Sequence, residues 1–492
     1  MVVQGRSPST QLAARLAAAV GPDHVRMGTS LERVRDWWPL ALKDLPEVEL
    51  GVTPWAIVSP ASASQIAAVL RACAEHATPV TPFAGGSGVV GAAIPARHGV
   101  LLDLRRLNRI GPLDTDNMLV TVEAGVLGGD IERALRERGF TLGIYPQSLE
   151  LATVGGWVST RATGTYSGHY GGIESRLAGI EVALADGTLA RTPLMPRWAI
   201  GPDLAQLFVG AEGTLGVLTE ITLAVERWPT TRLHRAALFP HLRQGFAAVR
   251  EFVQSGLAPA VVRLHDEQET ARLQTLAAAD RPSCLLLLAF DGPTRLAEVI
   301  QQLTLEVCAH HGAIDLGSEP AARWDTSRLH VPAGFAALQE PGVLADFIDI
   351  QAPWDRLDAV YETARDALLA HCTTVMAHFS HVYDQGSSIY FVISITAPND
   401  EEAVLRYRCA WDAVMNAVLA SGGAIAHHHG IGMARSAWVE RALAEAWPLW
   451  DRLKHAFDPA GLLNPGKLGH PASRTGPEIS AAAEHSAGHV DG

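Results

Sequence analysis

The stretch 145–172 constrains the fold most, because it is long, rich in small residues and free of the Lys/Glu pattern of a solvated helix. It reads YPQSLELATVGGWVSTRATGTYSGHYGG. Several of its small residues offer backbone N–H or hydroxyl groups as hydrogen-bond donors: Gly155, Gly156, Ser159, Thr160, Thr163 and Gly164. A buried diphosphate attached to a flat ring would need such a surface. The stretch therefore predicts a loop that wraps a buried ligand of this kind.

Two further glycine-rich segments accompany this stretch. The first, TPVTPFAGGSGVVGAA at 78–93, follows a predicted strand and places Gly85, Gly86, Gly88 and Gly91 close together. Glycines let successive backbone N–H groups converge on an anion, so the segment is either a phosphate cradle or an ordinary turn. It matches neither GxGxxG nor the Walker A pattern. The second, FVGAEGTLGVLTEITL at 208–223, again joins glycines to a strand.

Length and charge limit the class of protein. A chain of 492 residues with 48% hydrophobic residues should divide into two or three domains. A formal net charge of -13 argues against a nucleic-acid partner. The five cysteines form no CxxC pair, and we find neither a signal peptide nor an apolar run of ~20 residues that could span a bilayer. We therefore expect a cytoplasmic protein without an integral membrane segment, for which peripheral contact with a membrane stays open.

The texture of the chain predicts an α+β or α/β architecture up to about Pro229 and a separate α+β domain after it. Short β-branched runs alternate with Ala/Leu-rich helical stretches from residue 56 to about Pro229, and the ADG at 185–187 signals a hairpin turn. Between about 230 and 420 the pattern becomes repeated strand and helix, with strands at 260–266 and 284–292 and helices near 242–255 and 295–311. A helical stretch is expected at 436–457, and the tail 471–492 is predicted to be disordered.

The three glycine segments, in this order and spacing, resemble the FAD-binding domain of the vanillyl-alcohol oxidase superfamily. More narrowly, SLELATVGGWVSTRATG, APWDRL (352–357), YDQGSSIYF (383–391) and AIAHHHGIG (424–432) are similar to the alkyldihydroxyacetonephosphate synthase family, also called alkylglycerone-phosphate synthase. The resemblance implies an FAD-binding domain of two α+β subdomains at 48–228, a cap domain at 229–425, and a segment 426–470 that returns to the FAD domain and active site. Residues 1–47 would form an N-terminal helical segment.

The same resemblance indicates which residues would contact the cofactor. It places them at Pro82, Ala84, Gly85, Gly86, Ser87, Gly88, Pro146, Ser148, Leu149, Thr153, Gly155, Gly156, Ser159, Thr160, Thr163, Gly164, Glu212, Gly213, Gly216 and Val217. Some relatives attach FAD covalently through a His or Cys in the first glycine loop. This loop has neither residue, so we expect non-covalent FAD.

The triplet His427, His428 and His429 raises the question of a metal. Three consecutive imidazoles cannot all point the same way, so one ion could collect at most two of them. Relatives of the D-lactate and glycolate dehydrogenase type carry a site resembling HxGDGNxH followed later by EHGxG. Here the first histidine corresponds to His381, but Ser388 and His428 stand where the second histidine and the carboxylate would be. We therefore expect no metal.

In the synthase family the corresponding histidines line the flavin site, and the tyrosine that matches Tyr390 abstracts a substrate proton. We therefore predict catalytic roles for Tyr390 and His427, His428 and His429, and for Arg263, which matches a family arginine near the active site. A phenol is a poor base at neutral pH unless neighbours stabilise its phenolate, and the histidines could do so. The structural alternative is that these rings only pack against one another.

One departure bears on the substrate. The family places a second arginine, which handles substrate phosphate, about twenty residues before APWD. Here that region reads LHVPAGFAALQEPG and contains no arginine. The leading interpretation is a synthase that exchanges the acyl group of an acyl-dihydroxyacetone phosphate for a fatty alcohol through a flavin N5 adduct, in ether lipid synthesis. The alternative is an FAD-linked oxidase or dehydrogenase of a hydroxy acid or alcohol. In either case we expect a small-molecule or lipid-like substrate and a homodimer.

Overall fold

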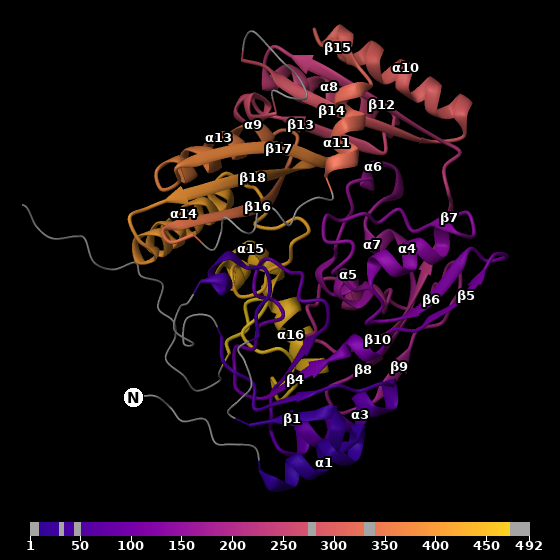
Figure 1. Ribbon diagram of the computed structural model, residues 1–492, viewed down its shortest axis with the longest axis vertical. Coiled ribbons are helices and arrows are strands. Elements are labelled where there is room, and N and C mark those ends of the chain that lie inside the picture. The colour runs from indigo at the N-terminus through magenta and orange to yellow at the C-terminus, as the bar shows by residue number, and fades with distance from the viewer. Residues whose placement is uncertain (1–8, 29–33, 44–50, 274–281, 329–339, 473–492) are drawn as a thin grey trace, which may run out of the picture.

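The computed structural model describes residues 9–28, 34–43, 51–273, 282–328 and 340–472. The chain forms an α+β structure, with small sheets at one end and one large sheet at the other (Figure 1). The predicted disordered tail at 471–492 lies almost wholly outside the described residues.

The FAD-domain part contains two sheets. The four-stranded sheet has the order β1-β2-β4-β3, with β1 Val25–Met27, β2 Ala56–Val58, β4 Val100–Asp103 and β3 Val80–Phe83. The five-stranded sheet has the order β5-β6-β10-β8-β9, with β5 Ile110–Asp114, β6 Leu119–Glu123, β10 Val217–Ala224, β8 Leu177–Ala183 and β9 Leu189–Arg191. The turn between β8 and β9 contains Gly187 at φ +81°, as the ADG signal predicted.

Short helices connect these strands, and one of them contains Gly155 and Gly156. They are α1 Thr10–Val20, α3 Ala63–Glu75, α4 Gly128–Arg136, α5 Val154–Thr160, α6 Ser167–Tyr170 and α7 Ile173–Arg176. Helix α5 begins where the Thr153 side chain accepts a hydrogen bond from the Gly156 N–H, and it ends at Arg161 in the left-handed conformation. A small ribbon of β7 Phe140–Thr141 and β11 Glu226–Arg227 leads to the cap.

The cap is built on a seven-stranded sheet with the order β15-β12-β14-β13-β17-β18-β16. Its strands are β12 Thr231–Phe239, β13 Val261–His265, β14 Cys284–Gly292, β15 Ile314–Gly317, β16 Val343–Pro353, β17 Thr374–Tyr383 and β18 Gly386–Thr396. Its helices are α8 Leu242–Gln254, α9 Glu267–Arg272, α10 Thr294–His310, α11 Glu319–Ser327, α13 Leu357–Leu369 and α14 Asp400–Ala420. The strand predicted at 284–292 is fully confirmed.

The sheet separates an apolar face from a polar one. In the register of β16, β18 and β17, Ile348 pairs with Phe391, which pairs with Ala377, and all three belong to the hydrophobic core with α13 and α14. The next row in the same register is Asp349, Tyr390 and His378. Because neighbouring rows point to opposite faces, this polar row faces away from the helices.

The C-terminal segment returns beside the FAD-domain sheets, where Figure 1 shows it in yellow. The helical stretch predicted at 436–457 is confirmed, although it is divided into short 3₁₀ turns, α15 Val439–Leu443 and α16 Trp447–Phe457. Ala444 adopts φ +46° at the break, and Pro448 lies in the first turn of α16. Proline has no N–H to donate and clashes with the carbonyl one turn back, so the helix must restart there.

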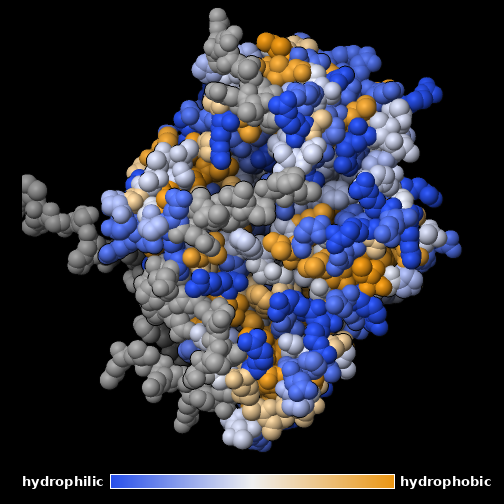
Figure 2. Space-filling view, in the orientation of Figure 1, coloured by the Kyte–Doolittle hydropathy of each residue, from blue (hydrophilic) through white to orange (hydrophobic). Residues whose placement is uncertain are grey.

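The surface and the helices agree with the expectation of no membrane span. Within the described residues, no helix is both long and apolar enough to cross a bilayer. On the face shown in Figure 2, hydrophobic residues occur in separate small groups among hydrophilic ones.

Gly143 and Gly139 offer a matched test of packing in the FAD domain. Both adopt a left-handed φ, +73° and +79°, but a Cβ on Gly143 would lie 2.1 Å from Cγ of Tyr170, whereas one on Gly139 would meet nothing within 4 Å. Gly139→Ala should cost about 1–2 kcal/mol through backbone strain alone. Gly143→Ala should cost about 1–3 kcal/mol more in the free energy of unfolding, because the Tyr170 ring must move. Equal losses on urea denaturation would contradict this account.

Candidate active site

A cavity of about 570 Å³ lies between the glycine segments and the polar face of the cap sheet. Every residue that we expected to contact FAD lines this cavity except Gly164. A Cβ on Gly164 would lie 2.2 Å from the Tyr145 nitrogen, so this glycine permits the loop to fold back on itself instead. The cap side is lined by Arg263, Phe347, His378, Ser380, His381, Tyr390, His428 and His429.

The glycine segments fit a diphosphate-bearing cofactor. The backbone N–H groups of Gly85, Gly86, Ser87 and Gly88 donate no hydrogen bond to any other described residue, although all four residues line the cavity. The Thr163 hydroxyl also lines the cavity and is buried without a partner. A Cβ on Gly85 would lie 2.2 Å from the Leu151 carbonyl oxygen, so only glycine lets the two segments approach this closely. These free donors are what an anionic diphosphate requires.

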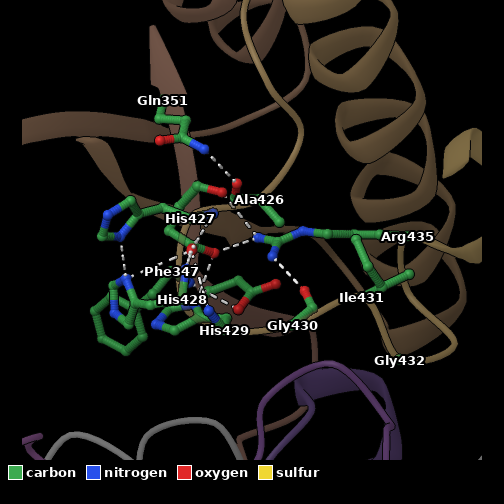
Figure 3. A network of polar contacts seen from close by, with 12 residues as sticks. Phe347, Gln351, Ala426, His427, His428, His429, Gly430, Ile431, Gly432 and Arg435 are labelled. Atoms are coloured by element: carbon green, nitrogen blue, oxygen red, sulfur yellow. Dashed lines mark hydrogen bonds and ion pairs between the residues drawn. The ribbon is translucent and has the colours of Figure 1, made fainter. Parts of the chain in front are cut away.

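The histidine triplet is held by one buried carboxylate. Asp349, on β16, accepts hydrogen bonds on Oδ2 from the backbone N–H groups of His427, His428 and His429, at 2.9, 2.6 and 3.1 Å. Its other oxygen pairs with the buried Arg435 guanidinium at 2.5 Å. Figure 3 shows Arg435 reaching toward the histidine segment, where it also donates to the Gly430 carbonyl. Burial would raise the pKa of Asp349, but Arg435 and the neighbouring histidines hold that pKa well below its usual value.

A second buried carboxylate fixes the residues that follow the triplet. Glu212, from the third glycine segment, accepts hydrogen bonds from the N–H groups of Ile431 at 2.5 Å and Gly432 at 2.9 Å. A Cβ on Gly432 would lie 2.1 Å from the Val90 carbonyl oxygen, so the chain here lies directly on the first glycine segment. The segment 427–432 is therefore tied to the cap by Asp349 and to the FAD domain by Glu212.

Tyr390 lies among three imidazoles. Its ring stacks on His378, with 4.6 Å between ring centroids, lies nearly parallel to His428 at 6.1 Å, and meets the edge of His429 at 5.3 Å. Burial raises the pKa of Tyr390, the Asp349 carboxylate raises it further, and Arg263 opposes both. Burial also lowers the pKa of His378 to about 3 and that of His428 well below its usual value. Tyr390 is thus a phenol beside neutral His378 and His428, whereas the sequence suggested a stabilised phenolate.

Arg263 belongs to a buried polar cluster that sequence reasoning missed. Its Nη2 lies 3.1 Å from Nδ1 of His378, and Nδ1 of His378 lies 2.8 Å from Oε2 of Glu269. The Arg263 guanidinium lies 3.8 Å from Glu269 and 5.4 Å above the Trp324 ring. His378 and Glu269 therefore fix the position of the one arginine on the cap side of the cavity. The only sequence signal was the histidine pair in HFSH, at 378 and 381.

His381 occupies a β-bulge. It adopts φ +51°, and the register between β17 and β18 shifts between Ser380 and Val382. The left-handed backbone is costly for a residue other than glycine, and bulges of this kind redirect a side chain. The His381 ring lines the cavity, stacks on His427 at 5.2 Å and accepts or donates one hydrogen bond with the Ser167 hydroxyl at 2.7 Å.

Of the five predicted catalytic residues, His427 is the one that does not line the cavity. His427 lies behind His428, where its Nε2 contacts the Tyr383 hydroxyl at 2.7 Å. Ser388 is fully buried, and its hydroxyl donates to the Ser380 carbonyl at 2.5 Å.

Comparison with known proteins assigns both parts of the chain. Residues 54–193 match the FAD binding domain model, and residues 229–468 match the model of the C-terminal domain of FAD linked oxidases. The uncharacterized FAD-linked oxidoreductase YgcU of Escherichia coli is 30% identical over 431 residues, which cover 84% of this chain and 89% of that protein. Alkyldihydroxyacetonephosphate synthase of Dictyostelium discoideum is 26% identical over 91% of this chain and 79% of that protein.

Solved structures show the same fold. An alkyldihydroxyacetonephosphate synthase superposes with a TM-score of 0.76 at 21% identity, covering 94% of this chain and 87% of the other. P-cresol methylhydroxylase with substrate bound superposes with a TM-score of 0.75 at 19% identity, covering 94% and 96%. The glycine segments, the cavity and the matches to both domain models lead to one conclusion: the chain belongs to the FAD-linked oxidase family and uses FAD as its cofactor.

Proposed function

We propose that this protein is an FAD-linked oxidoreductase that oxidises a carbon bearing a hydroxyl group, in an alcohol or hydroxy acid of low charge. The observation that supports this proposal is the charge of the cavity. Arg263 is the only Arg or Lys among the described residues that line it, and Glu269 lies 3.8 Å from that guanidinium.

A phosphorylated substrate would be poorly matched to this site. A phosphate monoester carries close to two negative charges at neutral pH, and its burial needs paired cations or several charge-assisted hydrogen bonds. The imidazoles of His378 and His428 add no charge, since the pKa of each lies far below neutrality. One arginine that shares its charge with Glu269 suits a single carboxylate or a neutral oxygen better.

Each residue on the cap side has a part in the proposed reaction. FAD, when bound by the glycine segments, supplies the hydride acceptor. Neutral His428 accepts the proton of the substrate hydroxyl as the carbon is oxidised, and the Tyr390 phenol donates a hydrogen bond to the same oxygen. Arg263, fixed by His378 and Glu269, binds a carboxylate or second oxygen of the substrate.

The synthase reaction is the second candidate, and one observation favours it. Tyr390, Arg263, His428 and His429, which match the residues of that family, line one cavity. In that reaction Tyr390 would remove a proton from an acyl-dihydroxyacetone phosphate, and a fatty alcohol would replace the acyl group with no net redox change. The raised pKa of Tyr390 and the single arginine weigh against it.

The proposal also includes metal independence. Among the described residues, two groups of side chains come close enough to share an ion: Asp349 with His427 and His428, and His265 with Glu269 and His378. The oxygens of Asp349 already accept three N–H groups and the Arg435 guanidinium. The second group already has the Arg263 guanidinium 3.1 Å from His378. A divalent ion at either place would compete with a fixed cation or with hydrogen bonds that hold the fold.

Anaerobic mixing with substrates tests the function. An alcohol or hydroxy acid such as D-lactate, glycolate or a fatty alcohol should bleach the 450 nm band of FAD, and the band should stay bleached until an oxidant is added. His428→Asn should slow this reduction by about 10²-fold or more, the scale of a lost base, whereas Tyr390→Phe should slow it by about 10- to 10²-fold, the scale of one charge-assisted hydrogen bond.

The exposed His455 provides the control, because His455→Asn should leave the rate unchanged. No lasting bleaching by any alcohol or hydroxy acid, together with ether formation from an acyl-dihydroxyacetone phosphate and a fatty alcohol, would favour the synthase instead.

Non-covalent FAD is expected from the sequence of the first glycine segment, since residues 84–88 read AGGSG and contain neither His nor Cys. Acid or heat precipitation of the purified protein should release the yellow cofactor into the supernatant. Flavin that stays with the pellet through a denaturing wash would refute this prediction.

Metal removal should leave the enzyme active. Elemental analysis should find Zn and Mn well below one equivalent, and flavin reduction should survive dialysis against EDTA, because Arg435 and Arg263 supply the positive charge in the two candidate places. A full equivalent of metal whose removal abolishes flavin reduction would contradict the prediction.

A further inference from the structure

Three side chains form a continuous row from the cavity to the surface. His428 lines the cavity, and its Nδ1 lies 2.9 Å from Nδ1 of His427. Nε2 of His427 lies 2.7 Å from the Tyr383 hydroxyl. Tyr383 is 39% exposed at the end of β17. We propose that Tyr383, His427 and His428 form a proton path between the active-site cavity and solvent.

The backbone holds this row in place. The N–H groups of His427 and His428 are both bound by Asp349. At the outer end, Tyr383 pairs with Gly386 across the β17–β18 turn, and its carbonyl accepts a hydrogen bond from the Trp354 indole at 3.1 Å. The three hydrogen-bonding groups are therefore fixed by the cap sheet, so the contacts do not depend on long flexible side chains.

The row has two proton arrangements that use the same heavy-atom contacts. In one, His428 donates from Nδ1 to His427, His427 donates from Nε2 to Tyr383, and the Tyr383 hydroxyl donates to water. A proton that arrives at Nε2 of His428 then leads to transfer of one proton along each contact and release of one proton to water. In the second arrangement, which results from this transfer, His427 donates from Nδ1 to His428 and the Tyr383 hydroxyl donates to Nε2 of His427. Rotation of the groups, or return of a proton from water toward the cavity, restores the first arrangement.

The Asp349 carboxylate favours the arrangement that accepts protons from the cavity. Its Oδ2 lies 3.5 Å from Nδ1 of His428, so a hydrogen on that nitrogen is electrostatically stabilised. Such a hydrogen leaves Nε2 of His428 as an acceptor. The isolated imidazole has no comparable bias, which makes the tautomer of His428 a measurable mark of the path.

The charged groups around the row are few and do not block it. Arg161 and Glu174 lie near Tyr383 and form an ion pair of their own at 3.7 Å. His427 faces Asp349, Arg161, His429 and the stacked ring of His381. Burial lowers the pKa of His427 to about 4, so this residue is neutral at physiological pH and can both accept and donate a proton.

The inference rests on the proposed function in one respect, that the cavity carries chemistry which releases a proton. Oxidation of a hydroxyl-bearing carbon leaves the hydroxyl proton on His428, and the site regains its base only when that proton departs. Tyr383 and His427 do not touch the reacting atoms, so their role is to carry the proton away from the residue that does.

The test uses histidine NMR on the FAD-bound full chain, with ¹⁵N-labelled histidine and no substrate. Long-range ¹H–¹⁵N spectra should show neutral His427 and His428 near pH 7, with the His428 hydrogen on Nδ1. That hydrogen should exchange with water several-fold more slowly in Tyr383→Phe, which removes only the hydroxyl. Ser167→Ala is the matched control, because it removes a hydroxyl from His381 in the same cluster but outside the path.

The outcomes separate the path from the reaction. Equal exchange in wild type and Tyr383→Phe would overturn the proposal. The proposal would also be overturned if the wild type carried its hydrogens on Nε2 of both His427 and His428, because no hydrogen would then lie between the two Nδ1 atoms. This measurement uses the wild type alone, so it does not depend on the folding of a variant. Failure of every alcohol and hydroxy acid to bleach the flavin would count against the proposed function and leave the exchange result standing.

Discussion

The arrangement of the active site depends on one buried carboxylate, that of Asp349. A carboxylate with no exposure to water is strongly destabilising unless it is paired and hydrogen-bonded. Here Arg435 supplies the opposite charge, and three consecutive backbone N–H groups fill the remaining acceptor positions. Removal of either member of such a buried pair typically costs about 3–5 kcal/mol. The three consecutive histidines thus stabilise the buried Asp349 carboxylate through their backbone N–H groups.

Two domains share the histidine segment, and this explains why the cavity has fixed walls. Asp349 ties 427–429 to the cap, while Glu212 ties Ile431 and Gly432 to the third glycine segment. The residues proposed to act on substrate are thereby placed against the glycine segments, because both carboxylates bind backbone N–H groups whose positions do not depend on rotation of the histidine side chains. Such fixed placement is the main requirement for proton and hydride transfer at short range.

Much of this site could be predicted from sequence, but the partners of Tyr390 could not. The resemblance of the glycine segments to a known FAD-binding domain implied their cofactor contacts, and all of these except Gly164 line the cavity. In contrast, the turn at Asp384 and Gln385 would pair Tyr390 with Phe379 if β17 were regular. The bulge at His381 shifts the register by one residue, so His378 faces Tyr390 instead. A bulge at a histidine has no reliable sequence signal, whereas Pro448 is itself a sequence signal for the break in the C-terminal helical stretch.

The late position of Arg435 in the chain has a consequence for biosynthesis. Asp349 leaves the ribosome with β16, whereas its N–H donors and its guanidinium partner follow only at 427–435, after the whole cap sheet and α14 have been made. Until then the nascent cap cannot bury that carboxylate without a large electrostatic penalty, so its polar face must stay hydrated. Closing of the nascent chain around the cavity therefore remains costly until residues 427–435 have emerged.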